Sequence, residues 1–368
     1  MILNSLAITN FKNIADARLE FSSKINCLLG DNGMGKSNLL DAVYTLSFCK
    51  SFSGLTDLQL IRRGETFATL RGLYRRRDAD EEVTLGLQQG RRKSFKRGGK
   101  EYGRLSEHIG AFPLVLVAPA DTALITGTGE ERRRLMDQVI SQTDARYLDA
   151  LIRYGRTLQQ RNKLLRDRCV DHGLYGAVES AMAAAADYIT RRRAEWVAEL
   201  TGIFTAHYHD IATGGEQPSL ALRSHLADRP GASLDTLLDE ARFHDEAVGH
   251  TSVGPHRDDL LLCLDGMDVR RTASQGQQKT YVIALRLAQY EFLARATGMK
   301  PLLLLDDIFD KLDAHRVERL VEVVSSPMFG QIFITDTNRS HLDRIMARSG
   351  GDHRSWLVTA GAFTPTNP

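Results

Sequence analysis

Paired cysteines, long apolar runs and a strong excess of either charge are all missing from this sequence of 368 residues. The four cysteines lie far apart with no C-x-x-C pair, which argues against a disulfide framework or a zinc site and favours reduced core residues of a cytosolic protein. The longest apolar runs, residues 112–118 and 302–305, are far too short to cross a bilayer, and we expect no signal peptide. A net charge of only +2 does not by itself indicate a nucleic-acid partner. The length suggests two domains.

A glycine-rich segment typical of nucleotide-binding loops follows an early apolar run. Residues 30–37 read Gly-Asp-Asn-Gly-Met-Gly-Lys-Ser and fit G-x-x-x-x-G-K-[ST], the loop that wraps nucleoside triphosphate phosphates. Residues 25–29 resemble a buried strand, and from Lys36 onward apolar residues recur at helical spacing. A strand, a glycine loop and a helix would place several backbone N–H groups and the positive end of the helix dipole around one anion. The alternative, a chance match inside a loop, does not explain this context.

The end of this loop carries two residues with separate expected tasks. Lys36 would neutralise the β- and γ-phosphates, and Ser37 would ligate magnesium. The residues expected to bind ATP are Gly30, Asp31, Asn32, Gly33, Met34, Gly35, Lys36, Ser37 and Asn38.

A second apolar strand, far along the chain, ends in two carboxylates. Residues 301–305 read Pro-Leu-Leu-Leu-Leu and are followed by Asp306 and Asp307. A buried strand ending in a carboxylate is what a magnesium site beside a phosphate loop requires, so Asp306 would hold the metal directly or through water. Asp307 would orient or deprotonate the attacking water. For this segment alone, a buried strand followed by an acidic turn is the simpler reading.

The segment Ser274-Gln275-Gly276-Gln277-Gln278 leads into an expected helix with one apolar face. Ser274 is a good N-cap residue, and Gly276 would let backbone approach a ligand closely. The start of this helix is thus a second candidate anion site, although simple helix capping explains the segment equally well. One nucleotide cannot easily use both helix ends within a single subunit.

Basic residues gather in the N-terminal third. Residues 91–100 carry six basic side chains and no acid, and three consecutive arginines begin at Arg75. Between them, residues 83–88 alternate apolar and polar as in a half-buried strand, which places the cations on turns and edges of an antiparallel sheet. Protection of an edge against aggregation is one explanation and contact with DNA phosphates is the other. The candidates for DNA contact are Arg75, Arg76, Arg91, Arg92, Lys93, Lys96 and Arg97.

A helical insertion is expected between the two nucleotide motifs. Residues 147–165 and 178–203 each carry an apolar stripe at helical spacing, and the break at 171–173 suggests an antiparallel hairpin. Arginines 132–134 and 191–193 are expected mainly on solvated faces, with contact to DNA or a partner as the alternative. We therefore expect an N-terminal part of the head at 1–128, a helical arm at 129–250 and a C-terminal part of the head at 251–368. For His256 and Arg257, an active-site role and a simple turn both remain open.

The order of these motifs resembles ABC-type ATPases, and most closely their SMC-like DNA-repair branch. The resemblance implies an α/β fold: an ABC-type P-loop ATPase head, with a mixed sheet around a central helix plus an antiparallel sheet, and an inserted α-helical arm. It also implies that two heads sandwich two nucleotides. The signature residues Ser274, Gln275, Gly276 and Gln277 would then contact the ATP held by the partner's phosphate loop.

Within that branch the chain resembles the RecF family of bacterial recombination mediators. The resemblance rests on segments that run collinearly through nearly the whole chain; the most specific are Gly254-Pro255-His256-Arg257-Asp258-Asp259-Leu260 and Ser274-Gln275-Gly276-Gln277-Gln278-Lys279. Further matching segments are residues 10–13, 51–52, 117–121, 131–134 and 160–165.

Three positions depart from the wider ABC pattern. Gln275 replaces the first signature glycine, Asp307 stands where a glutamate base is usual, and Asp336 stands where a switch histidine is usual. The lid-loop glutamine of such ATPases has no clear equivalent. Aspartate is one methylene shorter than glutamate, and an ionised aspartate cannot donate a hydrogen bond to the γ-phosphate. We therefore expect slow hydrolysis, below about one turnover per second.

The RecF resemblance implies a weak ATPase that uses ATP and Mg²⁺ to form a homodimer on duplex, gapped or single-stranded DNA. It further implies work with RecR and RecO to place RecA on single-stranded DNA during replication and repair, in the cytoplasm at the nucleoid. The ATP-hydrolysing subunit of an ABC transporter is an alternative, disfavoured by the altered signature and the helical insertion. Further alternatives are another SMC-like repair ATPase and a P-loop kinase or nucleotidyl transferase, for which a single nucleotide site would suffice.

Overall fold

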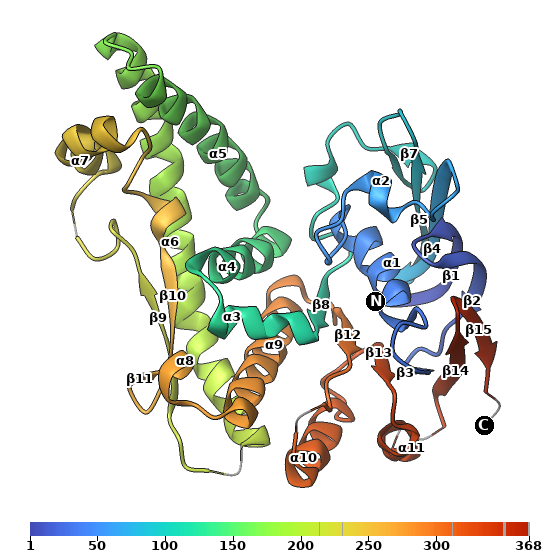
Figure 1. The fold of residues 1–368 in the computed structure, drawn as a ribbon. Coiled ribbons are helices and arrows are strands. Elements are labelled where there is room, and N and C mark those ends of the chain that lie inside the picture. The colour runs from blue at the N-terminus through green and yellow to red at the C-terminus, as the bar shows by residue number, and fades with distance from the viewer. Residues whose placement is uncertain (213, 230, 311, 349–350, 367–368) are drawn as a thin grey trace. The chain divides into compact units, whose positions relative to one another are not determined.

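The computed structural model describes residues 1–212, 214–229, 231–310, 312–348 and 351–366 (Figure 1). The chain forms two compact units. Unit 1 comprises Met1–Asp121, His207–Thr213 and Gln275–Pro368, and unit 2 comprises Thr122–Ala206 and Gly214–Ser274. These limits differ from the expected division of the chain, because residues 251–274 group with the insertion and the end of its longest helix groups with unit 1.

One of the two six-stranded sheets of unit 1 is entirely antiparallel. Its strand order is β2-β1-β4-β5-β6-β7. The strands are β1 (Ile2–Phe11), β2 (Ile14–Glu20), β4 (Phe67–Arg76), β5 (Ala79–Gln88), β6 (Ser94–Arg97) and β7 (Lys100–Glu101). The alternation of buried and exposed residues along β4 and β5 matches the period of two in the sequence, because one face packs on the core and the other meets solvent.

The other six-stranded sheet of unit 1 is mixed, in the order β15-β14-β3-β13-β12-β8. Its strands are β3 (Ile25–Leu29), β8 (Leu114–Val117), β12 (Leu302–Asp306), β13 (Ile332–Asp336), β14 (His353–Thr359) and β15 (Ala362–Pro365). All pairs are parallel except the β14–β15 hairpin. The carboxyl ends of β3, β12 and β13 therefore lie at one edge, which is where an open α/β sheet binds ligands.

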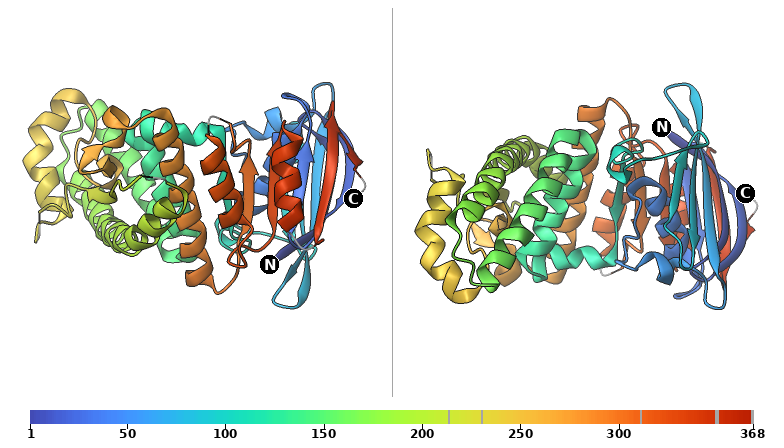
Figure 2. Two further views of the ribbon diagram at one scale, coloured as in Figure 1. Left: turned by 90° about the horizontal axis from the view of Figure 1, so that it is seen from below. Right: turned by 90° about the horizontal axis from the view of Figure 1, so that it is seen from above.

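Helix α1 (Lys36–Phe48) packs against strands of both sheets of unit 1 (Figure 2). Eleven of its 13 residues are buried, so it has no broad polar face. The expected head, with a mixed sheet, a central helix and an antiparallel sheet, is confirmed. The remaining helices of unit 1 are α2 (Asp57–Leu60), η1 (Leu105–Glu107), η2 (Pro119–Thr122, whose last residue falls in unit 2), α9 (Gln275–Thr297), α10 (Ala314–Val324) and α11 (Arg339–Arg348).

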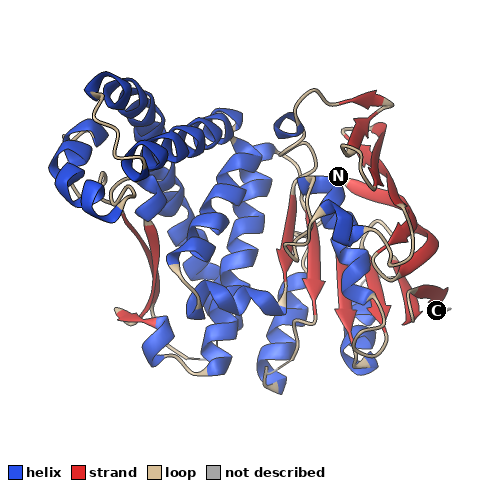
Figure 3. Ribbon diagram, turned by 45° about the horizontal axis from the view of Figure 1, so that its top comes forward, coloured by secondary structure: helices blue, strands red, loops and turns tan. Residues whose placement is uncertain are grey.

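Unit 2 is mainly helical and includes one small sheet (Figure 3). Its helices are α3 (Ala123–Thr126), α4 (Gly129–Thr143), α5 (Ala145–Arg166), most of α6 (His172–Ile211), α7 (Leu234–Val248), η3 (Pro255–Arg257) and α8 (Val269–Thr272). Its strands are β9 (Pro218–Arg223), β10 (Asp259–Leu264) and β11 (Met267–Asp268). Helices α5 and α6 form the expected antiparallel hairpin, since Arg161 pairs with Glu179 while Tyr147 contacts Arg193.

Strand β9 departs from the expectation of a helical insertion. It pairs with β10 in register Leu222 with Leu260. Its six residues alternate only briefly between apolar and polar, and they lie beside long helical stripes, so the pattern gave too weak a strand signal.

Candidate nucleotide-binding site

The glycine-rich loop joins β3 to α1, as expected. Gly30 has φ 158° and Gly35 has φ 113°. A Cβ atom on Gly30 would lie 2.4 Å from the carbonyl oxygen of Val358, and one on Gly35 would lie 2.8 Å from the side-chain amide of Asn13. Both positions therefore require glycine for conformation and for space. The loop can then run close to its neighbours while its N–H groups surround an anion.

Asn13 braces this loop from the β1–β2 turn. Its Nδ2 donates to the carbonyl oxygen of Met34 at 3.2 Å, and its Oδ1 accepts from Asn38 Nδ2 at 2.8 Å. The backbone N–H of Gly361, in the β14–β15 turn, also donates to Met34 O at 2.8 Å. No role could be predicted for Asn13 from the sequence, because nothing in the local pattern indicates that this turn reaches the loop.

Lys36 is only 7% exposed, and its ammonium group lies over the loop. It donates to the carbonyl oxygens of Gly30 and Asp31, the latter at 2.9 Å. Burial lowers the pKa of Lys36, and this is opposed by the carboxylates of Asp307, Asp306, Asp336 and Asp31. A partly desolvated ammonium fixed over a loop of N–H donors is suited to bind phosphate oxygens.

Ser37 and Asp306 meet at this site. The Ser37 hydroxyl donates to Asp306 Oδ1 at 2.9 Å, and Thr335 Oγ1 donates to the same oxygen at 2.7 Å. Asp306 is 6% exposed, and burial raises its pKa, against the effect of the hydrogen bonds from Thr335 and Ser37. A hydroxyl and a carboxylate side by side are hard oxygen ligands of the kind that Mg²⁺ prefers.

Asp307 follows β12 in a left-handed conformation, with φ 49°. Its backbone N–H donates to Thr335 Oγ1 at 3.1 Å, which fixes the turn beside β13. Asp307 is half-buried, directly after the carboxylate of Asp306. An aspartate in the left-handed region is uncommon and is often found at functional sites.

Asp336 ends β13 in register with Leu29, the last residue before the glycine loop. Its Oδ1 accepts from the backbone N–H of Asn338 and its Oδ2 contacts His341 Nδ1, both at 2.8 Å. The imidazole of His341 comes from α11, and its ring lies 5.1 Å from that of Phe309. His341 could not be predicted as part of the site, because a lone histidine at the start of a helix gives no signal in the sequence.

The signature residues Ser274, Gln275, Gly276 and Gln277 surround the start of α9. Ser274 and Gln275 are exposed. A Cβ atom on Gly276 would lie 2.5 Å from the guanidinium of Arg316, so this position has room only for glycine unless that side chain moves.

The cations expected to contact DNA lie on strands and turns of the antiparallel sheet. Three are engaged by acids: Arg76 and Arg97 pair with Glu81 at 3.3 Å and 2.6 Å, and Lys93 pairs with Asp57 at 3.0 Å. Four others are exposed, namely Arg75, Arg91, Arg92 and Lys96. The exposed set is therefore smaller than the sequence indicated.

A buried polar network in unit 2 includes residues of the segments 131–134, 160–165 and 254–260. Arg161 is 0% exposed and binds Glu179 at 2.8 Å and Asp245 at 2.6 Å. Arg193 binds Asp258 at 2.7 Å. Charged groups taken out of water in this way must be paired.

The expectation of solvated arginines is wrong for Arg132, Arg133 and Arg193. Arg132 forms a bidentate pair with Asp259 at 2.7 Å and 2.9 Å, and Arg133 donates to the carbonyl oxygen of Asp258 at 2.8 Å. Arg193 is almost wholly buried. Their basic runs look solvent-facing in the sequence, because the acids that pair with them lie far along the chain.

His256 belongs to the same network. Its Nδ1 lies 2.7 Å from the hydroxyl of Tyr154 and its Nε2 lies 3.0 Å from the carbonyl oxygen of Thr251. Burial lowers the pKa of His256 to about 4, so the ring is neutral near pH 7. These contacts favour a structural role of His256 in the turn over a role in an active site. Arg257 is exposed and donates to Thr251 O at 3.2 Å.

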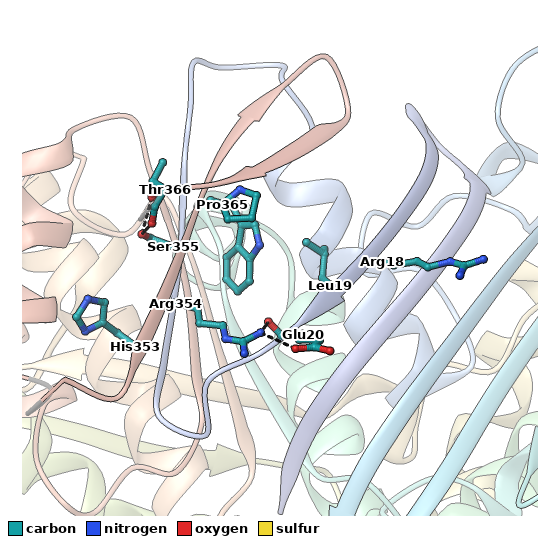
Figure 4. A pocket seen from close by; sticks show the side chains of 9 residues that line it. Arg18, Leu19, Glu20, His353, Arg354, Ser355, Pro365 and Thr366 are labelled. Atoms are coloured by element: carbon teal, nitrogen blue, oxygen red, sulfur yellow. Dashed lines mark hydrogen bonds and ion pairs between the residues drawn. The ribbon is translucent and has the colours of Figure 1, made fainter. Parts of the chain in front are cut away.

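A pocket of about 360 Å³ lies elsewhere in unit 1 (Figure 4). It is lined by residues of β2, β14 and β15, and its Arg354 pairs with Glu20 at 3.2 Å. It includes no residue of the glycine loop or of the Asp306–Asp307 turn. None of the helices in the described part of the chain has both the length and the apolar character that a membrane span requires.

Comparisons with known proteins agree with this arrangement. The family model of the RecF/RecN/SMC N terminal domain matches residues 2–350. A DNA replication and repair protein RecF of Bacteroides fragilis is 49% identical and covers 99% of this chain and 98% of its own. A protein of the same name from Porphyromonas gingivalis is 47% identical and covers 98% of this chain and 99% of its own.

Solved structures are similar over the same length. The structure of the recombination mediator protein RecF-ATP in the RecFOR pathway is 27% identical with a TM-score of 0.88, covering 100% of this chain and 98% of that one. The Smc head domain of Pyrococcus furiosus, at 16% identity and a TM-score of 0.59, covers 99% and 96% and shares the fold. The chain therefore belongs to the RecF family of DNA replication and repair proteins, and its unit 1 has the fold of an ABC-type ATPase head.

Proposed function

We propose that this protein is an ATP-controlled DNA clamp. The adjacency of Ser37 and Asp306, 2.9 Å apart beside the buried ammonium of Lys36, is the observation that carries the proposal. It combines a phosphate cradle with two oxygen ligands at the carboxyl edge of a parallel sheet. The neighbouring structure of RecF-ATP supports ATP as the ligand.

Magnesium fits the residues present. Ser37 and Asp306 supply two hard oxygen ligands, and among the described residues no group of three or more His, Cys, Asp or Glu side chains could hold a metal. Mg²⁺ is usually held by few carboxylates together with phosphates and water, so a bound nucleotide would supply the remaining ligands. When bound, the metal would neutralise charge between the β- and γ-phosphates.

ATP would join two copies of the chain. In this proposal each copy holds the nucleotide by its loop, residues 30–38, while the exposed helix start at Ser274 and Gln275 contacts the γ-phosphate held by its partner. Loss of that phosphate removes the shared ligand and releases the dimer.

Hydrolysis would be slow. Asp307 takes the place of the water-orienting base and has the shorter reach of aspartate. The carboxylate of Asp336 already accepts from Asn338 and contacts His341, and cannot itself donate to a phosphate. We propose turnover below about one per second, which suits a switch.

The closed dimer would align cations along a duplex or a gap junction, among them Arg75, Arg91, Arg92 and Lys96. We further propose that it works with RecR and RecO to help load RecA onto single-stranded DNA, in the cytoplasm. The recombination mediator named in the RecFOR pathway supports this role. A transporter subunit is less well supported, since the relatives are named as replication and repair proteins.

DNA binding measured with ATP, with ADP and without nucleotide tests the proposal. We expect tight binding of duplex or gapped DNA with ATP, and weaker binding with ADP or without nucleotide. Equal affinity in all three states would refute an ATP-controlled clamp. Sedimentation in the same solutions separates a clamp from a single-site kinase, whose oligomeric state need not depend on ATP.

A further inference from the structure

A row of exposed cations runs along α5 in unit 2. Arg146, Arg153, Arg156 and Lys163 recur at intervals of seven, three and seven residues, which places them on one side of the helix. At a rise of about 1.5 Å per residue the row is about 26 Å long. The buried residues of α5, Tyr147, Ala150, Tyr154, Arg161 and Leu165, lie on the side that faces the rest of unit 2.

Arg191 of α6 joins this row through Tyr188. The guanidinium carbons of Arg146 and Arg191 lie 5.2 Å and 5.3 Å from the centre of the Tyr188 ring. The Tyr188 hydroxyl donates to Asp144 Oδ2 at 2.8 Å, so the ring is fixed in place. Stacking on a fixed ring positions both guanidinium groups while their N–H donors remain available at the edges. We call Arg146, Arg153, Arg156, Lys163 and Arg191 the α5 cationic surface.

None of these five side chains forms an ion pair with a carboxylate in the part of the chain that the structure describes. Two exposed arginines elsewhere in unit 2 do form such pairs. Arg134 pairs with Glu130 at 3.1 Å, and Arg229 pairs with Glu240 at 2.7 Å. Asp149 is the only acid within α5. The α5 cationic surface therefore carries a net positive charge, which Asp149 offsets only in part.

A groove of about 190 Å³ adjoins this surface between α5 and α6. Alanines 181, 184 and 185 and Tyr188 of α6 line one side, and Arg146, Asp149, Ala150 and Arg153 of α5 line the other. Methyl side chains let a ligand's backbone approach the helix, while the two guanidinium groups stand beside it. Such an arrangement is suited to a ridge of phosphates.

We propose that the α5 cationic surface binds the sugar–phosphate backbone of duplex DNA. This inference rests on the proposed DNA clamp and assigns the inserted unit a direct part in it. At 3.4 Å per nucleotide of one strand, a row of about 26 Å spans about seven to eight phosphates. Guanidinium groups flank the ring of Tyr188, so the ring is not available to stack on a base. The proposed contacts are with the sugar–phosphate backbone and are therefore independent of the DNA sequence.

Two matched variants of the full chain test this inference. The first carries Arg146→Gln, Arg153→Gln, Arg156→Gln and Lys163→Gln. The second, a control, carries Arg134→Gln, Arg229→Gln, Arg295→Gln and Arg319→Gln, which removes the same charge from exposed arginines that already pair with acids. All eight positions are at the surface, and thermal unfolding checks that both variants fold as the unsubstituted protein does.

The readout is the fluorescence anisotropy of a labelled duplex oligonucleotide with a non-hydrolysable ATP analogue, at several salt concentrations. Each phosphate contact removed should lower the slope of log affinity against log salt by roughly 0.9 units, so we expect the first variant to lose about 3 to 4 units. Its affinity for the duplex should fall at least tenfold. The control should change the slope by less than about one unit.

Equal slopes and affinities for the two variants would overturn the inference. Unchanged DNA binding with lost binding of polyglutamate by the first variant would also overturn it, in favour of an acidic protein partner. Failure of the proposed function is a separate result: the unsubstituted chain would then show no ATP-dependent DNA binding.

Discussion

The hydroxyl oxygen of Ser37 lies 2.9 Å from a carboxylate oxygen of Asp306, although 269 residues separate them in the chain. The contact exists because β3 and β12 are parallel strands on either side of β13, so their carboxyl ends meet at one edge. Thr335, at the end of β13, donates to the same carboxylate at 2.7 Å. Three strand ends thus meet at the proposed site for a phosphate and a metal.

Lys36→Ala should abolish ATP-driven dimerisation and greatly weaken nucleotide binding. The ammonium is buried over the loop, and a hydrogen bond to a charged group contributes about 1.5 to 3 kcal/mol, so affinity should fall by roughly 10- to 150-fold. Titration calorimetry with ATP measures this change. Lys100→Ala, at an exposed position in β7, is the control and should bind ATP normally. Equal loss in both variants would contradict the assignment of Lys36.

Asp307→Asn should block hydrolysis and leave ATP binding and dimerisation in place. An amide cannot accept a proton from water, and loss of a general base lowers a rate by about 10²- to 10⁴-fold. Phosphate release under steady-state conditions measures the rate. For the unsubstituted protein we expect turnover below about one per second. A rate tens of times higher in the presence of DNA would contradict the switch.

Neutralising the turn between β5 and β6 should weaken DNA binding. Arg91 and Arg92 are exposed, so Arg91→Gln with Arg92→Gln should lower the salt slope by about 2 units. Lys93→Gln alone should have a smaller effect, because Lys93 already binds Asp57 at 3.0 Å and the carbonyl oxygen of Cys49 at 2.8 Å. Salt titrations of DNA affinity distinguish the two variants, and equal effects would place Lys93 among the direct contacts.

Stability should fall between pH 6.5 and pH 4 because of His108. The ring is fully buried between Leu46 O at 2.7 Å and the Tyr102 hydroxyl at 3.0 Å, and burial lowers its pKa to about 4. A histidine whose pKa is lower in the folded state stabilises the fold above its unfolded pKa of about 6.5, and loses that contribution as the pH falls. At pH 4.5 the loss should be about 2 to 3 kcal/mol.

Urea unfolding at pH 7.5 and pH 4.5 measures this loss. The comparison of the unsubstituted chain with His108→Gln isolates the contribution of His108 from that of other titrating groups, such as His256. An identical pH dependence in both proteins would show that His108 does not contribute.

Much of the site could be predicted because its residues are marked locally. The glycine loop is continuous in the sequence. Asp306 directly follows an apolar run that predicts a buried strand, and the end of that strand lies beside Ser37. Asn13 and His341 could not be predicted in this way, since turns and helix packing carry them to Met34 and Asp336.

The buried network of unit 2 was hidden for a related reason. Arg193 and His256 lie in polar stretches that resemble solvated surface, and only the packed fold brings Asp258 and Tyr154 beside them. Burial of a charge depends on a partner distant in sequence, and neither periodicity nor composition records that partner.

Sedimentation of the full chain with a non-hydrolysable ATP analogue, beside Ser274→Arg, tests the central claim most directly. The account predicts that the unsubstituted protein shifts from the mass of one chain, 41.0 kDa, to twice that mass, while Ser274→Arg binds the analogue yet stays at 41.0 kDa. If the unsubstituted protein remains a monomer when saturated with the analogue, or if Ser274→Arg dimerises as readily, ATP does not join two heads through the start of α9.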